Sequence, residues 1–195
     1  MSVNVGPAAA ARFAWPNAAP RELTIAVTRI ARHVARSGAR TVGLLPVDGD
    51  AAHPEQCAPL LLRIAEGLTG FVSDDVAIVD AWPTWPWGEA VAIDDLAAPV
   101  VRPVAPRVVS LSPPPCHDAL AAAMALQQAL ASRPAGATLA LVNLAGYAPF
   151  GTVPPAVEHV ERVVLLVTAR HSRQAAVAGL ADRLAGKALG AVLLG

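Results

Sequence analysis

The chain has 195 residues, 15 basic and 15 acidic side chains, and an apolar content of 54%. This length suits one domain with a substantial core. The balanced charge gives no electrostatic basis for nucleic acid as a partner. The longest apolar runs, Val163 to Val167 and Ala188 to Leu194, are far shorter than the roughly 18 to 20 residues that cross a bilayer, so we expect no direct membrane insertion.

The first 20 residues lack the basic start and apolar run of a secretory signal. We therefore predict a cytoplasmic protein, which reaches the inner membrane, if at all, as a peripheral component held by a partner. Cys57 and Cys116 lie far apart and form no CxxC spacing, which argues against a zinc site or a redox pair. We expect both thiols to be reduced, with no bound metal.

Residues 1–20 have low complexity and predict a flexible N-terminal arm, followed by a single domain over residues 21–195. Apolar residues recur with the period of a helix over residues 21–37. Apolar runs predict strands at 41–47, 76–80, 108–111, 138–143, 163–168 and 191–194, and helices through 60–68, 116–132 and 172–184. This alternation predicts an α/β, Rossmann-like fold with a mostly parallel sheet and helices on both faces.

The segment between the first predicted strand and the next helix has the position of a phosphate-binding loop. Such a loop combines a glycine-rich turn with a lysine that neutralises phosphate and a hydroxyl that holds magnesium. Here the segment reads Pro46-Val47-Asp48-Gly49-Asp50-Ala51-Ala52-His53-Pro54. Its position and flanks fit such a loop, but its residues supply neither the lysine nor the hydroxyl.

The order and spacing of these segments resemble the cytoplasmic domain of bacterial tyrosine kinases and polysaccharide co-polymerases. They are also similar to the wider MinD and ParA group of P-loop ATPases. The resemblance runs from about Glu22 to the C-terminus. It implies a P-loop-NTPase-like fold in which the family loop G-E-G-K-[ST]-T is matched by residues 49–54.

The match identifies a degenerate phosphate loop. Gly49 and Asp50 align with the start of the family pattern, Ala52 replaces the lysine, and His53 replaces a hydroxyl residue. Without the lysine, the charge of a transferring phosphoryl group is not stabilised. The acids Asp48 and Asp50 would also repel a triphosphate, so we predict no ATP hydrolysis through this loop and no bound cofactor.

Two positions correspond to the acids that hold magnesium in the family. Asp80 is retained at the end of its strand, whereas Trp82 stands at the second acid of the family's Asp-Ala-Asp pattern. Asn143 occupies the place of the Walker B carboxylate. An amide oxygen can coordinate a metal but carries no charge, so magnesium affinity should fall. Leu194 replaces the asparagine that contacts adenine in the family.

The tryptophans Trp82, Trp85 and Trp87 lie in a Trp-Pro segment directly after Asp80. One interpretation is that their rings cover the sheet edge or the vacant nucleotide pocket. The other is a surface for a protein partner, because exposed tryptophan is costly unless something covers it.

A second candidate partner site lies on the first predicted helix. Arg29 and Arg32 match the two arginines of the family's oligomerisation pattern E-x-x-R-x-x-R, while Ala26 replaces its glutamate. Either a homodimer or a contact with an active paralogue is compatible with this pattern.

Three hypotheses of function follow. The first is a catalytically inactive relative of the polysaccharide-biosynthesis kinases that serves as a regulatory or structural partner of an export or polymerisation complex. The second is a polarity, division or pilus-positioning protein of the MinD and ParA group. The third is an enzyme with a remodelled metal site built from Asp48, Asp50, His53 and Asp80. The first and second assign no catalytic residue.

Overall fold

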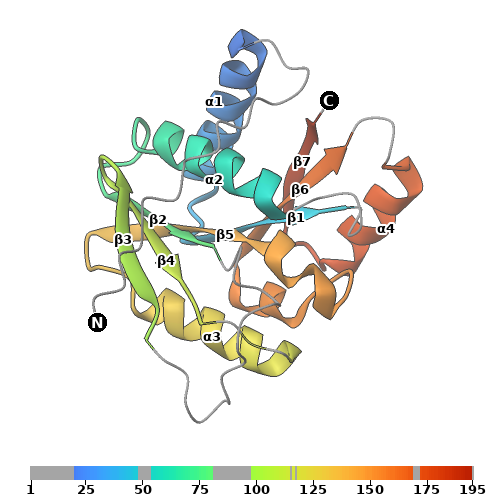
Figure 1. Ribbon diagram of the computed structural model, residues 1–195. Helices are drawn as coiled ribbons and strands as arrows, with labels where there is room; N and C mark the ends of the chain where they lie inside the picture. Colours follow the sequence, from blue (N-terminus) through green and yellow to red (C-terminus); the bar gives the residue numbers. More distant parts are fainter. Residues whose placement is uncertain are drawn as a thin grey trace.

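The computed structural model in Figure 1 describes residues 20–47, 54–80, 98–114, 116, 118–168 and 172–194. Three predicted features lie outside the described residues, namely the arm before Pro20, the degenerate phosphate loop with Gly49, Asp50, Ala52 and His53, and the tryptophans Trp82, Trp85 and Trp87. Pro20, which we assigned to the arm, is the first residue of a helix.

The described residues form a seven-stranded sheet with the strand order β3-β4-β2-β5-β1-β6-β7. Neighbouring strands are parallel except for β3, which is antiparallel to β4. The strands are β1 (Thr41–Pro46), β2 (Asp75–Val79), β3 (Val100–Ala105), β4 (Val108–Ser112), β5 (Ala137–Asn143), β6 (Arg162–Thr168) and β7 (Ala188–Leu194). The helices are α1 (Pro20–Ser37), α2 (Pro54–Leu68), α3 (Ala119–Ala131) and α4 (Gln174–Arg183), with 3-10 helices η2 (Leu144–Phe150) and η3 (Pro155–His159).

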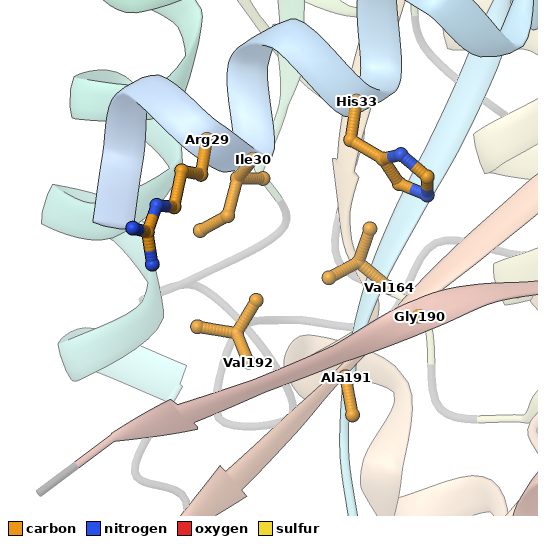
Figure 2. Close-up of a pocket in the computed structure, with 7 residues that line it drawn as sticks. All are labelled: Arg29, Ile30, His33, Val164, Gly190, Ala191 and Val192. Carbon is orange, nitrogen blue, oxygen red and sulfur yellow. The ribbon is translucent and has the colours of Figure 1, made fainter. Parts of the chain in front are cut away.

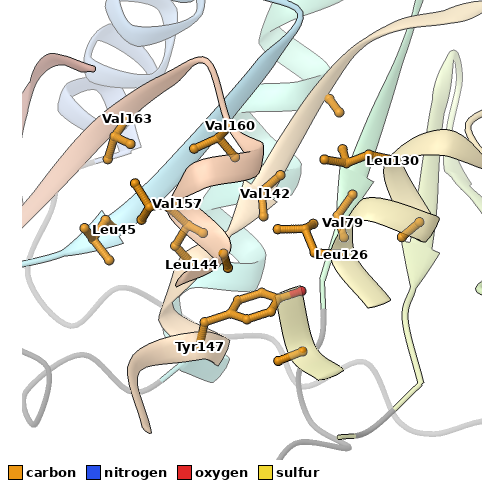
Figure 3. Close-up of a cluster of buried hydrophobic side chains, with 14 of the residues drawn as sticks. Leu45, Val79, Leu126, Leu130, Val142, Leu144, Tyr147, Val157, Val160 and Val163 are labelled. Atoms are coloured by element: carbon orange, nitrogen blue, oxygen red, sulfur yellow. The ribbon is translucent and has the colours of Figure 1, made fainter. Parts of the chain in front are cut away.

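Helices cover both faces of this sheet (Figure 1). Strand β6 illustrates the alternation, because Val164 packs toward the core under α1 and α2 whereas Val163 packs toward the core beside α3 and α4. Figure 3 shows the second of these cores, in which Tyr147 from η2 lies beside Leu144. The α/β fold with a mostly parallel sheet is therefore confirmed.

Strand β3 was not predicted, because the segment contains Pro99, Pro103 and Pro106, which exclude a long helix and are rare inside strands. The strand lies at the edge of the sheet, where proline is tolerated. The carbonyls of Arg107 and Leu111 accept hydrogen bonds from the backbone N–H groups of Val76 and Asp80. The backbone groups of odd-numbered residues in β4 therefore point to β2, and those of even-numbered residues point to β3. Pro103 is paired with Val109 and therefore directs its nitrogen away from the ladder, where it removes a donor from the free edge.

Helix α3 begins at Ala119 rather than at Cys116 as predicted. Asp118 is its N-cap, and the Asp118 Oδ1 accepts a hydrogen bond of 2.8 Å from the backbone N–H of Ala121. The sequence pattern alone placed the start of this helix three residues earlier, at Cys116. The N-cap residue has non-helical dihedral angles, so the Asp118 cap sets the start at Ala119.

Gly43 is required in the centre of β1 because η2 packs directly against it. A Cβ atom at this position would run into the Leu144 side chain, and it would lie 3.4 Å from the Cγ2 of Val160. Both neighbours are buried in the core. Close packing of this kind leaves little space for an added methyl group.

We expect Gly43→Ala to lower the free energy of unfolding by about 1 to 3 kcal/mol through overpacking. The measurement is urea unfolding followed by circular dichroism. Gly179→Ala is the matched control, because a Cβ at this position in α4 meets no atom within 4 Å. There we expect a gain of about 0.5 to 1 kcal/mol from improved helix propensity. Equal effects of the two substitutions would contradict the packing argument.

Candidate functional site

The carboxyl edge of the parallel strands is the candidate functional site. In the sheet β5 lies between β2 and β1. Asp80 directly follows β2, Asn143 ends β5, and β1 ends with Pro46 at the same edge. Ligand sites of open α/β sheets lie outside the carboxyl ends of their strands. The sequence placed Asp80 and Asn143 at such an edge, and the structure brings them into direct contact.

A hydrogen bond joins Asn143 to Asp80. The Nδ2 of Asn143 donates to the Oδ1 of Asp80 at 3.0 Å, and the Oδ1 of Asn143 accepts from the backbone N–H of Ala145 at 3.1 Å. Asn143 is fully buried. Because a carboxylate only accepts and a backbone N–H only donates, these partners allow a single orientation of the amide.

This orientation disfavours a magnesium ion held between Asn143 and Asp80. The Asn143 Oδ1, which is the atom that would coordinate a cation, already accepts from Ala145, and the amide NH₂ faces the carboxylate of Asp80. The described residues contain no group of three His, Cys, Asp or Glu side chains arranged for a metal. Of the acids and histidine in the third hypothesis, Asp48, Asp50 and His53 lie outside the described residues.

The charge of Asp80 acts on two buried titratable groups, Cys57 and Tyr147. Burial raises the pKa of the Cys57 thiol to about 12, and the negative charge of Asp80 contributes to this increase. Burial also raises the pKa of Tyr147 above its usual range, with further contributions from Cys116 and Asp80. Both residues therefore remain protonated near neutral pH. The cause in each case is an interior that disfavours added negative charge.

Sequence analysis did not assign Cys57 or Tyr147 to this edge. For Cys57 a signal exists, because α2 follows the predicted phosphate loop and Cys57 lies in its first turns. For Tyr147 the sequence offers no such signal, since the path of the 3-10 helix η2 depends on the packing of Leu144 and Tyr147 against Val157 and the other residues of that core.

Cys116 lies in the same core. Its Sγ donates to the carbonyl of Pro114 at 3.4 Å. Burial and, to a lesser extent, the charge of Asp118 raise its pKa to about 11. Like Cys57, it is a buried free thiol and is not an activated nucleophile, because nucleophilic cysteines have a lowered pKa.

The candidate partner residues Arg29 and Arg32 lie apart from Asp80 and Asn143, on the exposed side of α1. The guanidinium carbon of Arg32 is 5.7 Å from the centre of the Phe71 ring, a cation–π contact. Arg29 borders a groove between α1 and the edge strand β7. The structure thus separates the candidate partner arginines from the acid and amide of the carboxyl edge.

No family model matches the chain, and no curated protein matches it. Among solved structures, the chain is similar to the chimerical protein CapA2B2, with a TM-score of 0.55 and 13% sequence identity. The match covers 86% of this chain and 82% of that chain. A likeness at this identity establishes a related fold and carries no function by itself. None of the described helices is long and apolar enough to cross a membrane.

Replacing the buried amide by a carboxylate tests the contact between Asn143 and Asp80. In Asn143→Asp, two carboxylates would meet at the distance now spanned by a hydrogen bond, and one of them would be fully buried. We expect a loss of unfolding free energy on the order of 3 kcal/mol at pH 7. This pairing raises a carboxyl pKa in the folded protein, so the loss should shrink as the pH falls toward about 4.

The exchange variant Asp80→Asn/Asn143→Asp provides the control. It restores one carboxylate and one amide, so urea unfolding should show recovery of much of the stability lost in the single variant. Additive losses in the exchange variant would indicate that the two side chains do not interact.

The raised thiol pKa values predict that stability decreases in alkaline solution. A thiol whose pKa is higher in the folded chain than in the unfolded chain favours folding while it is protonated. For Cys57 this contribution is complete below the ordinary pKa of 9.0 and is lost as the pH rises toward about 12. We therefore expect Cys57→Ala to show a shallower decrease in unfolding free energy between about pH 9 and about pH 12.

Cys116→Ala is the matched comparison, because the Cys116 pKa is raised to about 11. It should also flatten the pH dependence, over a narrower range. Parallel pH profiles for the wild type and both variants would show that neither thiol is protected from ionisation.

Proposed function

We propose that this chain is a non-hydrolysing P-loop-NTPase-like domain that serves as a regulatory or structural partner of a bacterial polysaccharide biosynthesis or export complex. The observation that carries the proposal is the Asn143 amide, held between Asp80 and the Ala145 N–H. In the family that the sequence resembles, a metal-binding carboxylate stands at this position. Here the position supplies an internal hydrogen bond in place of a charge for a cation.

The changes at this edge are mutually consistent in electrostatic terms. A phosphoryl-transfer site needs cationic charge, from lysine and from magnesium, to stabilise the transferring group. Ala52 removes the first source, and the engaged amide of Asn143 weakens the second. The buried Cys57 thiol beside Asp80 adds no charge, since its raised pKa keeps it neutral near pH 7. Taken together, these three features support the proposal that the domain has lost catalysis.

The assignment to polysaccharide biosynthesis rests on the sequence resemblance to the cytoplasmic domain of tyrosine kinases and polysaccharide co-polymerases, carried by the ordered segments from about Glu22 onward. The fold shared with CapA2B2 over most of both chains is compatible with this resemblance. In a protein without turnover, the exposed arginines Arg29 and Arg32 and the tryptophans Trp82, Trp85 and Trp87 are the candidate residues for partner contact.

Isothermal titration with ATP and magnesium, together with a phosphate-release assay, tests the loss of catalysis. We expect no micromolar binding and no phosphate release above that of a heat-denatured sample, because the charges that hold the phosphates are missing. Ala52→Lys is the informative variant, since it returns the phosphate-binding cation and should bind ATP more tightly than the wild type. Micromolar binding with turnover by the wild type would overturn the proposal.

A further inference from the structure

A groove of about 360 Å³ lies between α1 and β7. Figure 2 shows Arg29, Ile30 and His33 extending from α1 toward the sheet, with Val164 and Val192 pointing back toward the helix. The floor is apolar and the helix contributes basic groups to the rim. The groove therefore offers room for an aliphatic side chain below positively charged or hydrogen-bonding groups.

His33 fixes one end of the groove. Its Nε2 is 3.1 Å from the backbone carbonyl oxygen of Leu189, and since a carbonyl only accepts, the ring nitrogen donates this hydrogen bond. The bond joins α1 to the edge strand β7. The walls of the groove are thus held together by a specific contact.

The exposed side of α1 is basic in the second half of the helix. Arg29, Arg32, His33 and Arg36 are exposed and lie at helical spacings of i, i+3, i+4 and i+7. We call these four residues the basic stripe. Residues 24–37 contain no acidic side chain. Within the described part of the chain, the ion pairs between arginine and carboxylate involve Arg63 and Arg107.

We propose that the groove and the basic stripe together bind an acidic segment of a partner protein. The segment places an aliphatic side chain between Ile30 and Val192 and lays its carboxylates along the basic stripe. Burial of the aliphatic side chain supplies affinity, and the arginines supply orientation and rate of association. This inference rests on the proposed function, because it gives the chemistry of a partner for that non-catalytic domain.

The charge of the basic stripe argues against a second copy of this chain as the occupant. A two-fold contact centred on the basic stripe brings the same patch of both copies together, so arginines would face arginines, because Glu22, the carboxylate of α1, lies two turns before Arg29. A membrane surface is also disfavoured, since lipid headgroups form a broad plane whereas the apolar floor is recessed beneath α1.

Two substitutions separate the contributions of charge and shape. Arg29→Glu reverses the charge at the rim. Gly190→Val fills the groove, because a Cβ at Gly190 meets no atom within 4 Å and the backbone there is not in the left-handed region. Arg63→Glu is the charge-matched control, since Arg63 is exposed on α2 and pairs with Glu66 at 3.8 Å outside the groove. Thermal melts verify that each variant is folded.

The probe is a random peptide library displayed on phage and selected against the full chain. We expect the selected peptides to carry aspartate or glutamate beside an aliphatic residue. Fluorescence anisotropy with a labelled selected peptide should give a Kd at least about tenfold weaker for Arg29→Glu and for Gly190→Val. The Arg63→Glu control should bind as the wild type does, and added salt should weaken binding.

Several outcomes overturn the inference: no selected peptides, peptides without acidic residues, or peptides that bind the two groove variants as tightly as the wild type. Light scattering that shows a dimer disrupted by Gly190→Val would assign the groove to a second copy instead. Flotation with phosphatidylglycerol vesicles that depends on Gly190 and Arg29 would assign it to a membrane. These results are independent of the ATP titration, so ATP turnover with intact peptide binding would refute the proposed function alone.

Discussion

The central constraint on this protein is a parallel sheet whose inner strands are buried on both faces. Strand β1 is buried along its entire length, and β5 beside it and β2 on the far side of β5 are buried at nearly every residue. Such strands have no exposed side on which polar chemistry can be placed. Polar groups are therefore confined to the ends of the strands and to the outer helices. The Asp80–Asn143 contact lies at the ends of two such strands, and the basic stripe lies on the outer helix α1.

The same constraint explains what the sequence could and could not predict. Strands buried on both faces leave contiguous apolar runs, so β1, β2, β5 and β6 were predicted close to their observed limits. Strand β3 escaped prediction because all of its residues are exposed or partly exposed and it contains Pro103. The limits of α3 depended on the Asp118 cap, which competes with equally helical neighbours in the sequence.

For the candidate site, sequence reasoning gave positions but not contacts. It placed Asp80 and Asn143 at strand ends, because a change from apolar to polar residues is visible along the chain. The hydrogen bond between them depends on β2 and β5 being adjacent in the sheet, which is long-range information. The effect of Asp80 on Cys57 and the groove beside β7 likewise arise from packing between segments distant in sequence. The tryptophans and the phosphate-loop residues remain sequence-based predictions.

An uncharged residue at position 143 has a physical rationale in the stability of the fold. A fully buried carboxylate next to Asp80 is stable only if a cation neutralises the pair. Without such a cation, an acid at position 143 would be a cost in stability. An amide that donates to Asp80 removes this cost and turns the two side chains into a structural link between β2 and β5.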